Sequence, residues 1–129
     1  PETVFNYLLR LGWGHGDEEI VSRERAIELF DLSGVGRSPS RTDEKKLENL
    51  NGHYIREADD ARLTDLVAPR IAKLIKADAA TIDRDLLVRA MPGLKPRAKK
   101  LDELADGALF LFRTRPLTFD EKAAALLDE

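Results

Sequence analysis

Apolar residues recur at three- and four-residue spacing along most of the chain, and this periodicity limits the fold more than any other feature. Val4, Leu8 and Leu11 follow the spacing near the start of the sequence. Side chains three or four positions apart lie on one face of a helix, so the pattern predicts amphipathic helices with one buried stripe each. We therefore expect a mostly all-α fold, with very short strands possible only at 20–21 and 109–112.

Polar residues mark where the first predicted helices begin. Ser22 suits the N-cap of a short helix that runs to Phe30, and Asp43 suits the N-cap of one that runs to about Arg56. Another helix is expected to open at 59–60. Pro69 cannot donate an amide, so we expect that helix to break there and a new one to start at Pro69 itself.

The second half of the chain carries similar signals. Asp83 is expected to cap a helix that the Pro-Gly pair at 92–93 stops. Pro96 suits the first turn of the next helix. Thr118 and Glu121 have the spacing of a capping box, which predicts a last helix through residue 127.

One helical stripe and one aromatic residue are also predicted to belong to the core of the first half. Ala26, Ile27 and Phe30 are expected to form the buried stripe of the helix that Ser22 caps. Trp13 is also expected to be buried.

Several classes of protein are excluded or disfavoured by composition. There are no cysteines, which excludes a disulfide framework and a thiolate zinc site and fits a reducing cytoplasm. No apolar run approaches the roughly 20 residues that span a bilayer, and no signal peptide is apparent. The chain begins at Pro1 without an initiator Met, so we expect a processed or excised segment.

The charge of the chain is unevenly distributed. The formal net charge is −3, which by itself argues against nucleic acid. Residues 84–100, however, contain six bases and only one acid, Asp85. RNA responds to the local field of such a patch more than to the total charge. The six bases are Arg84, Arg89, Lys95, Arg97, Lys99 and Lys100.

The cations at 95–100 stand at the start of a predicted helix, where the macrodipole is already positive. That placement is locally unfavourable, and an anionic partner such as RNA phosphate would offset it. Arg97 could also read a base edge, because its planar guanidinium matches paired acceptors. The alternative is an exposed basic turn whose cations pair with Asp102 or Glu103 one helical turn away.

A second, weaker basic cluster lies between residues 37 and 46, tempered by acids at 43 and 44. Arg37 and Arg41 flank the loop Ser38-Pro39-Ser40, which could offer hydroxyl and guanidinium groups to a sugar–phosphate backbone. The alternative is a solvated loop. The remaining bases of the cluster are Lys45 and Lys46.

Catalytic and metal-binding patterns are not found. His15 and His53 are the only histidines, and neither has a nucleophile motif nearby. The acidic run 17–19 lacks the alternating ligands of a calcium loop, and there is no P-loop or dinucleotide-binding glycine pattern. We therefore expect no catalytic residue, no metal ligand and no cofactor in this chain.

Two stretches of the sequence resemble motifs of a known protein family. Residues 6–17, followed by Glu19-Ile20, closely resemble the segment after the second catalytic signature of bacterial-type glutamyl-tRNA synthetases. Residues 46–56 are similar to a later motif of that family, which usually has Trp at the place of Asn49. Beyond residue 59, only Lys95-Pro96-Arg97 and the helical pattern resemble the family distinctly. Gly36 is a further departure, since the family usually has Ser there.

The resemblance implies a division of labour within a larger enzyme. Residues 1–58 would be a helical stem-contact region, and 59–129 the first part of a helical-bundle anticodon-binding region, truncated at its C-terminal end. The family's catalytic domain is absent, so ATP, glutamate and magnesium would bind elsewhere in a cytoplasmic glutamate–tRNA ligase. The partners implied are that remaining chain and tRNA-Glu, with tRNA-Gln also charged in some relatives; membranes and DNA are not expected.

The resemblance also implies roles for individual residues. Arg97 stands where relatives use an Arg to help read an anticodon base. The Arg37-Ser38 loop and Lys46 would contact the inner side of the tRNA near the D-stem. A stand-alone helical protein-interaction module is the main alternative function, and an independent small enzyme is disfavoured by the missing motifs.

Overall fold

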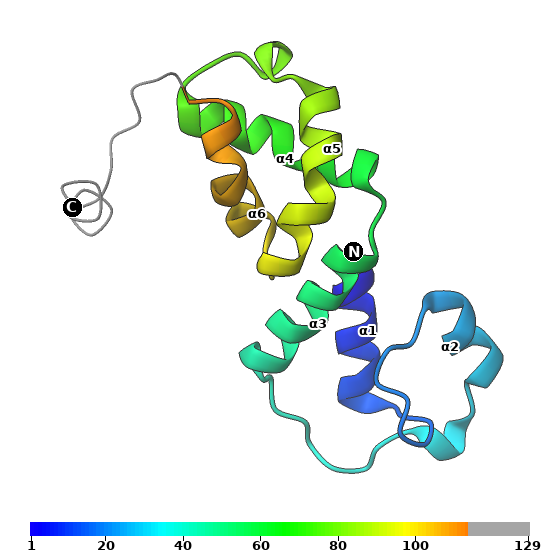
Figure 1. Cartoon of the computed structure of the whole chain (residues 1–129). Helices are drawn as coiled ribbons and strands as arrows, with labels where there is room; N and C mark the ends of the chain where they lie inside the picture. Colours follow the sequence, from blue (N-terminus) through cyan, green and yellow to red (C-terminus); the bar gives the residue numbers. More distant parts are fainter. Residues whose placement is uncertain (114–129) are drawn as a thin grey trace, which may run out of the picture.

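The computed structural model describes residues 1–113 and consists of helices joined by turns and loops (Figure 1). Within these residues the only β-type pairing is an isolated bridge between Trp13 and Val35. The all-α prediction is confirmed, and no strand forms at 20–21 or 109–112. The α-helices are α1 (Glu2–Gly12), α2 (Arg23–Leu29), α3 (Glu44–Glu57), α4 (Asp60–Ile75), α5 (Arg84–Leu94) and α6 (Leu101–Ala108). The short 3-10 helices are η1 (Leu32–Gly34), η2 (Ala79–Thr81), η3 (Lys95–Arg97) and η4 (Leu109–Leu111).

Four of the α-helices begin with a side-chain cap. In each, a serine hydroxyl or aspartate carboxylate accepts a hydrogen bond from the backbone amide three residues ahead, which satisfies one of the free amides of the first turn. The predicted caps at Ser22, Asp43 and Asp83 are confirmed, and Asp59 caps α4 in the same way.

Pro69 does not break its helix, so the expected division of α4 is wrong. The helix runs unbroken from Asp60 to Ile75 because its inner face is packed on both sides of the proline. Leu63, Val67 and Ile71 are all buried on that face. Pro69 itself is exposed, so the carbonyl that lacks its amide partner lies on the solvent side of the helix.

The turn between α5 and α6 also differs from expectation. Helix α5 passes through Pro92 and ends at Leu94, and the predicted helix at Pro96 is only the short η3. Ala98 then adopts an extended conformation and is buried, and α6 begins at Leu101. Burial of the Ala98 methyl against the core accounts for the interruption, because a continuous helix would carry the residue along another path.

The main core lies between α4, α5 and α6, which pack on one another. Ile55 of α3 joins this core, so α3 contributes to both halves of the molecule. Figure 1 shows the three helices gathered at one end and α1, α2 and α3 at the other. The fully buried core side chains include Val67, Ile71, Leu87, Met91 and Leu104.

Helix α1 packs against α3 with a polar inner face. The predicted helix is confirmed, but its predicted buried stripe is wrong: Val4 and Leu8 are 55% and 60% exposed. Thr3 and Asn6 are buried instead. Periodicity therefore located the helix but not the face that it buries.

Asn6 shows why a polar residue can occupy this position. Its carboxamide oxygen accepts hydrogen bonds from the Val21 amide at 3.0 Å and the Tyr54 hydroxyl at 2.9 Å. Its amide nitrogen donates to the Glu19 carbonyl at 3.1 Å. A buried carboxamide with these partners avoids the penalty of an unsatisfied polar group. The side chain thereby links α1, the following loop and α3.

Helix α2 buries only Ala26, so the predicted stripe is again only partly correct. Ile27 and Phe30 are exposed. Phe30 nevertheless stacks on Trp13, with ring centroids 6.0 Å apart. Trp13 is buried, as predicted, and its indole nitrogen donates to the Asp31 carbonyl at 3.0 Å.

Two predictions have no test in these residues. The expected helix at 118–127 lies outside the described part of the chain, and the division into units 1–58 and 59–129 stays a prediction. Among residues 1–113, no helix is both long enough and apolar enough to cross a membrane.

Candidate nucleic-acid interface

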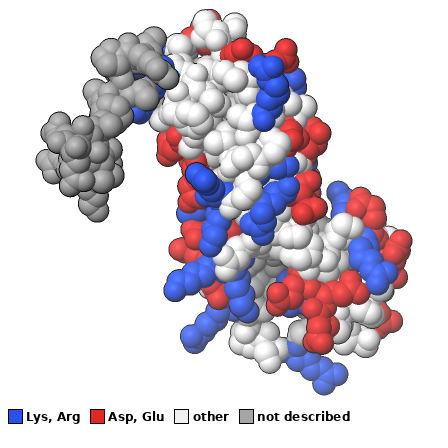
Figure 2. All heavy atoms as spheres, in the orientation of Figure 1, with Lys and Arg blue, Asp and Glu red and all other residues white. Residues whose placement is uncertain are grey.

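The predicted binding residues occupy two regions of the structure. One is the segment formed by α5, η3 and the start of α6, whose turn lies against α3 near the middle of the molecule (Figure 1), and the other is the loop at 35–43 with the start of α3. Figure 2 shows Lys and Arg side chains over the beginning of α3 and over the turn before α6, with acidic side chains between them. The cations are therefore interspersed with acids, and their individual partners decide which are available.

Lys95 is tied into the protein. Its ammonium lies 2.7 Å from a carboxylate oxygen of Asp60 and donates to the Ala58 carbonyl at 3.0 Å. Only 15% of its side chain is exposed. Both partners lie at the bend between α3 and α4, so Lys95 joins η3 to that bend.

Arg84 and Lys100 also face carboxylates. Arg84 binds Asp65 through two nitrogens, at 2.8 and 3.2 Å, and Lys100 lies 2.5 Å from Glu48. Hydrogen bonding to these cations lowers the pKa of Asp65 and of Glu48 below their ordinary values. Both pairs are largely exposed, so each contributes little to stability.

The cations at 95–100 do not pair with Asp102 or Glu103, which was the alternative considered for the basic turn. Asp102 pairs with Arg70 of α4 at 3.1 Å, and Glu103 accepts from the backbone amide of Lys99 at 2.8 Å. The cations of the turn instead find partners far away in the sequence. The Lys99 ammonium donates to the Asn49 carboxamide oxygen at 2.7 Å, at the position where the sequence departs from the family pattern.

Arg89 and Arg97 are the bases of this region that remain available. Both side chains are exposed, and neither forms an ion pair with any of residues 1–113. Arg97 lies in η3, between the tied residues Lys95 and Lys99. A guanidinium presented by a turn that is anchored on both sides is well placed to meet a planar acceptor pair.

The second region borders a hollow of about 990 Å³ between α1, the loop at 40–43 and the start of α3. Lys46 lines it, as do Arg41 and Lys45. These three side chains are exposed and form no ion pair within the described residues. The hollow is therefore bordered by free cations from one short segment, together with the acids Glu19, Asp43 and Glu44.

Two further residues of the hollow were not predicted as site residues. Arg10 and His53 contribute to its lining although they are remote in sequence from the basic segment. Helical spacing gave the only available signal, since His53 lies one helical turn after Asn49 and two after Lys46 on α3. Nothing in the sequence indicates that Arg10 of α1 would face them.

Arg37 and Ser38 line a second, smaller hollow of about 410 Å³. It adjoins the first, because Arg10, Leu11 and Ser40 line both. Glycines form much of its wall, so backbone groups make up part of the surface that faces the space. They are Gly12, Gly14, Gly16, Gly34 and Gly36.

Hydrogen bonds hold the start of α3 against α1. The Tyr7 hydroxyl accepts from the Asp43 amide at 2.5 Å and donates to the Asp43 carbonyl at 3.2 Å. The Ser40 hydroxyl donates to the Leu11 carbonyl. The basic segment is thus attached to a helix at both of these points rather than being a free loop.

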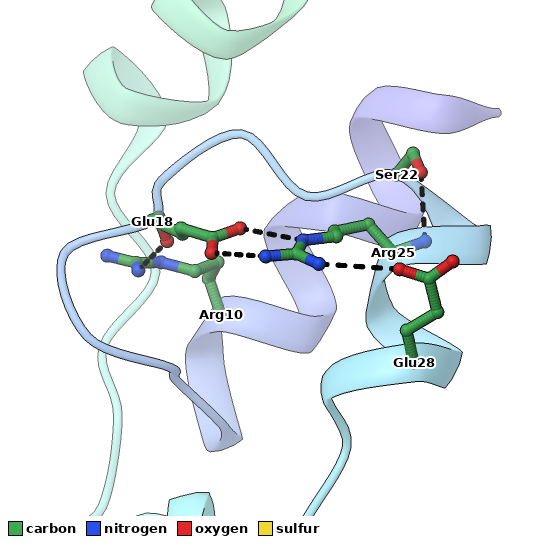
Figure 3. Close-up of polar contacts among 5 residues, drawn as sticks. All are labelled: Arg10, Glu18, Ser22, Arg25 and Glu28. Carbon is green, nitrogen blue, oxygen red and sulfur yellow. Dashed lines mark hydrogen bonds and ion pairs between the residues drawn. The ribbon is translucent and has the colours of Figure 1, made fainter.

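The loop between α1 and α2 is held by a charged network (Figure 3). Arg25 lies between two carboxylates, 3.1 Å from Glu18 and 3.3 Å from Glu28. Arg10 donates to the Glu18 carbonyl, and the Ser22 hydroxyl accepts from the Arg25 amide at 3.1 Å. Hydrogen bonding to Arg25 lowers the pKa of Glu18. Arg10 therefore borders the hollows from a fixed position.

Known proteins match the chain along its length. Residues 61–128 match the model of a family described as an anticodon binding domain. A glutamate–tRNA ligase from Rhizorhabdus wittichii is 69% identical over 99% of this chain and 27% of its own length. A glutamate–tRNA ligase from Zymomonas mobilis is 65% identical with the same coverage.

A solved structure shares the fold. The crystal structure of a glutamate tRNA ligase from Elizabethkingia meningosepticum, in complex with its amino acid, superposes with a TM-score of 0.79. The two are 24% identical, and the match covers 98% of this chain and 24% of that one. The chain thus spans about a quarter of the length of the relatives it matches. The predicted resemblance to glutamyl-tRNA synthetases is confirmed, and the chain belongs to the anticodon binding domain family.

Proposed function

We propose that this chain holds tRNA for a glutamate–tRNA ligase, positioning the stem with residues of its first half and inspecting the anticodon with residues of its second. One observation carries the proposal. Four exposed cations without an ion pair among residues 1–113 are concentrated on the segment 37–46, and Arg97 presents another in η3, whereas the other unpaired cations, such as Arg23 and Lys73, lie apart from these two places. The second place lies within the residues that match the anticodon-binding family.

The available cations divide the work according to their chemistry. Arg37 and Lys46, with the Ser38 hydroxyl, suit phosphate and ribose contacts that fix the orientation of the stem. Arg97 suits a base edge, since a guanidinium can donate two parallel hydrogen bonds. Arg89 is the other available base of this region, and Lys99, although it is hydrogen-bonded to the neutral Asn49 carboxamide, is not in an ion pair and adds positive potential. Lys95, Lys100 and Arg84 are assigned to the protein's own ion pairs and are left out of the RNA surface.

The activity of the whole ligase is part of the proposal. The complete enzyme would activate glutamate with ATP in the cytoplasm and transfer it to the terminal adenosine of tRNA-Glu. A form with relaxed specificity would also transfer glutamate to tRNA-Gln. We assign ATP, glutamate and magnesium to the rest of that ligase. This assignment is supported by the sequence, which contains no phosphate-binding glycine motif.

A titration of the 129-residue chain with tRNA tests the proposal. Binding to a tRNA-Glu transcript and to an unrelated tRNA is measured at two salt concentrations. About four phosphate contacts predict a loss of affinity of roughly tenfold for each doubling of salt, with the tRNA-Glu transcript preferred. Absence of RNA binding, or binding that salt does not weaken, would contradict the proposal and favour a helical protein-interaction module. ATP–pyrophosphate exchange by the chain alone would contradict the assignment of catalysis to the rest of the ligase.

A further inference from the structure

The turn before α6 binds the side of α3 through three polar contacts. The Asn51 amide nitrogen donates to the Lys99 carbonyl at 2.5 Å. The Lys99 ammonium donates to the Asn49 carboxamide oxygen at 2.7 Å, and the Lys100 ammonium lies 2.5 Å from Glu48. We call this set of contacts between 48–51 and 99–100 the α3–Lys99 contact. It joins residues that are about fifty positions apart in the sequence.

Close packing of the backbone accompanies these polar contacts. Gly52 is buried at the same place, and a β-carbon there would lie 3.2 Å from Cγ of Lys99 and 3.6 Å from its Cα. The absence of a side chain at Gly52 therefore lets the turn approach the helix. Even the β-carbon of alanine would require the flexible side chains of Lys99 and Arg56 to shift slightly.

Asn51 is itself fixed from the other side. The buried Thr3 of α1 donates its hydroxyl hydrogen to the Asn51 carboxamide oxygen at 2.9 Å. The carboxamide thus uses its oxygen on α1 and its nitrogen on the turn before α6. A second bridge runs parallel to it, because Glu2 of α1 lies 2.8 Å from Arg62 of α4.

The acid in this contact is difficult to explain if the turn serves only to bind phosphate. Glu48 stands beside the Lys100 ammonium and neutralises it, which weakens the local field toward RNA. Asn49 and Asn51 likewise engage donor and acceptor groups of the turn with neutral side chains. The side chains of the α3–Lys99 contact therefore have the chemistry of residues that hold two packed segments of the protein together.

We propose that the α3–Lys99 contact fixes the distance between the two cation regions, and so makes their binding to one tRNA simultaneous. The inference rests on the proposed function. Two weak sites held at the correct spacing act on one ligand as a bivalent binder, and the effective concentration of the second site depends on how rigidly they are joined. Glu48 and Asn51 are positioning residues: they act on tRNA affinity through geometry, without touching RNA.

The first test compares a whole tRNA-Glu transcript with its anticodon stem–loop alone. Glu48→Gln combined with Asn51→Ala is expected to weaken binding of the whole tRNA by about tenfold and to leave binding of the stem–loop unchanged. Asp65→Asn is the matched control for the charge, because it also removes one acid and breaks one exposed ion pair. That pair joins α4 to Arg84 within the second half of the chain and does not connect the two halves. The exchange Glu48→Lys with Lys100→Glu restores the pair and is expected to restore affinity relative to Glu48→Lys alone.

The possible results separate the two proposals. If neither RNA binds the unmodified chain, the proposed function fails. If both RNAs bind but the double variant weakens them equally, leaves both unchanged, or binds the whole tRNA more tightly, the positioning role is overturned. Tighter binding in particular would show that Glu48 acts only through its charge.

A second measurement is independent of RNA. The sequence contains no cysteine, so Glu24→Cys in α2 and Ala79→Cys in η2 give two unique labelling sites. Figure 1 places α2 and the connection between α4 and α5 at opposite ends of the molecule. Spin-label distance measurements are expected to give one narrow distribution, broadened by the double variant and unaffected by Asp65→Asn. A distribution that the double variant does not broaden would overturn the inference even if RNA binding behaved as expected.

Discussion

The Lys95 ammonium lies 2.7 Å from the Asp60 carboxylate, and this pair closes the bend between α3 and α4 against η3. The Lys95 side chain is 15% exposed and that of Asp60 is 31% exposed, so both charges are substantially removed from water. Removing one partner from such a pair leaves the other poorly solvated, which costs more than the pair itself contributes.

Lys95→Met is therefore expected to lower the free energy of unfolding by about 2–3 kcal/mol, below the 3–5 kcal/mol typical of a fully buried pair. Urea denaturation followed by circular dichroism measures the change. Lys45→Met is the control, since that side chain is exposed and forms no ion pair with residues 1–113. Equal effects of the two substitutions would remove the structural role assigned to Lys95.

Gly34 has no room for a side chain. A β-carbon there would lie 2.6 Å from the Gly14 carbonyl oxygen and 2.6 Å from the indole nitrogen of Trp13. The same indole nitrogen donates to Asp31, and the Gly14 amide donates to the Gly34 carbonyl at 3.0 Å. Gly34→Ala is expected to destabilise the chain by about 1–3 kcal/mol because the loop must shift. Gly14→Ala, where nothing lies within 4 Å, should change the midpoint of urea denaturation far less.

Side-chain caps in the sequence correctly predicted where three helices begin, whereas prolines gave the wrong positions for a helix break and for helix starts. Caps at Ser22, Asp43 and Asp83 depend on a carboxylate or hydroxyl and an amide three residues ahead, and that relationship is contained in the sequence. Whether a helix continues through a proline depends on packing of its other face, which the local sequence does not contain. Pro69 was mispredicted for this reason.

Pro69→Ala tests that explanation. Alanine would restore the amide that donates to the carbonyl four residues earlier and would remove the steric conflict of the ring. The free energy of unfolding should therefore increase by about 1–3 kcal/mol. Thermal unfolding measures the gain. Pro39→Ala is the comparison, because Pro39 lies in a loop and has no helical hydrogen bond to regain. A loss of stability in Pro69→Ala would mean that the proline is required by its surroundings.

The binding surface was predicted with less detail than the fold, and the reason is sequence distance. Six cations between 84 and 100 are equivalent in the sequence, where only neighbours three or four positions away can be considered as partners. In the structure Lys95 meets Asp60, Lys100 meets Glu48 and Arg84 meets Asp65. These pairings depend on tertiary packing. They divide the basic segment into residues that join helices and residues, such as Arg97, that face solvent.

Stability should depend on pH through Glu2. Its hydrogen bond to Arg62 lowers the pKa of the carboxyl to about 2 from an ordinary 4.5. A depressed pKa means that the stabilisation is fully present above about pH 4.5 and is lost as pH falls toward 2. Glu2→Gln is therefore expected to reduce the free energy of unfolding at pH 7, and the difference from the unmodified chain should shrink between these two pH values. A difference that stayed constant down to pH 2 would show that the loss comes from packing rather than from charge.

Arg97 and Lys46 are expected to affect tRNA binding in different ways. Arg97 is assigned to a base edge, so Arg97→Ala should abolish the preference for tRNA-Glu over an unrelated tRNA. Lys46 is assigned to the tRNA backbone, so Lys46→Ala should weaken both tRNAs alike and reduce the salt dependence by roughly one contact. Lys73→Ala on α4 removes an equal charge from an exposed side chain outside both cation regions and serves as control. If the control lowered the salt dependence as much as Lys46→Ala, RNA would be sensing the total charge of the chain, because only a local contact distinguishes these two lysines.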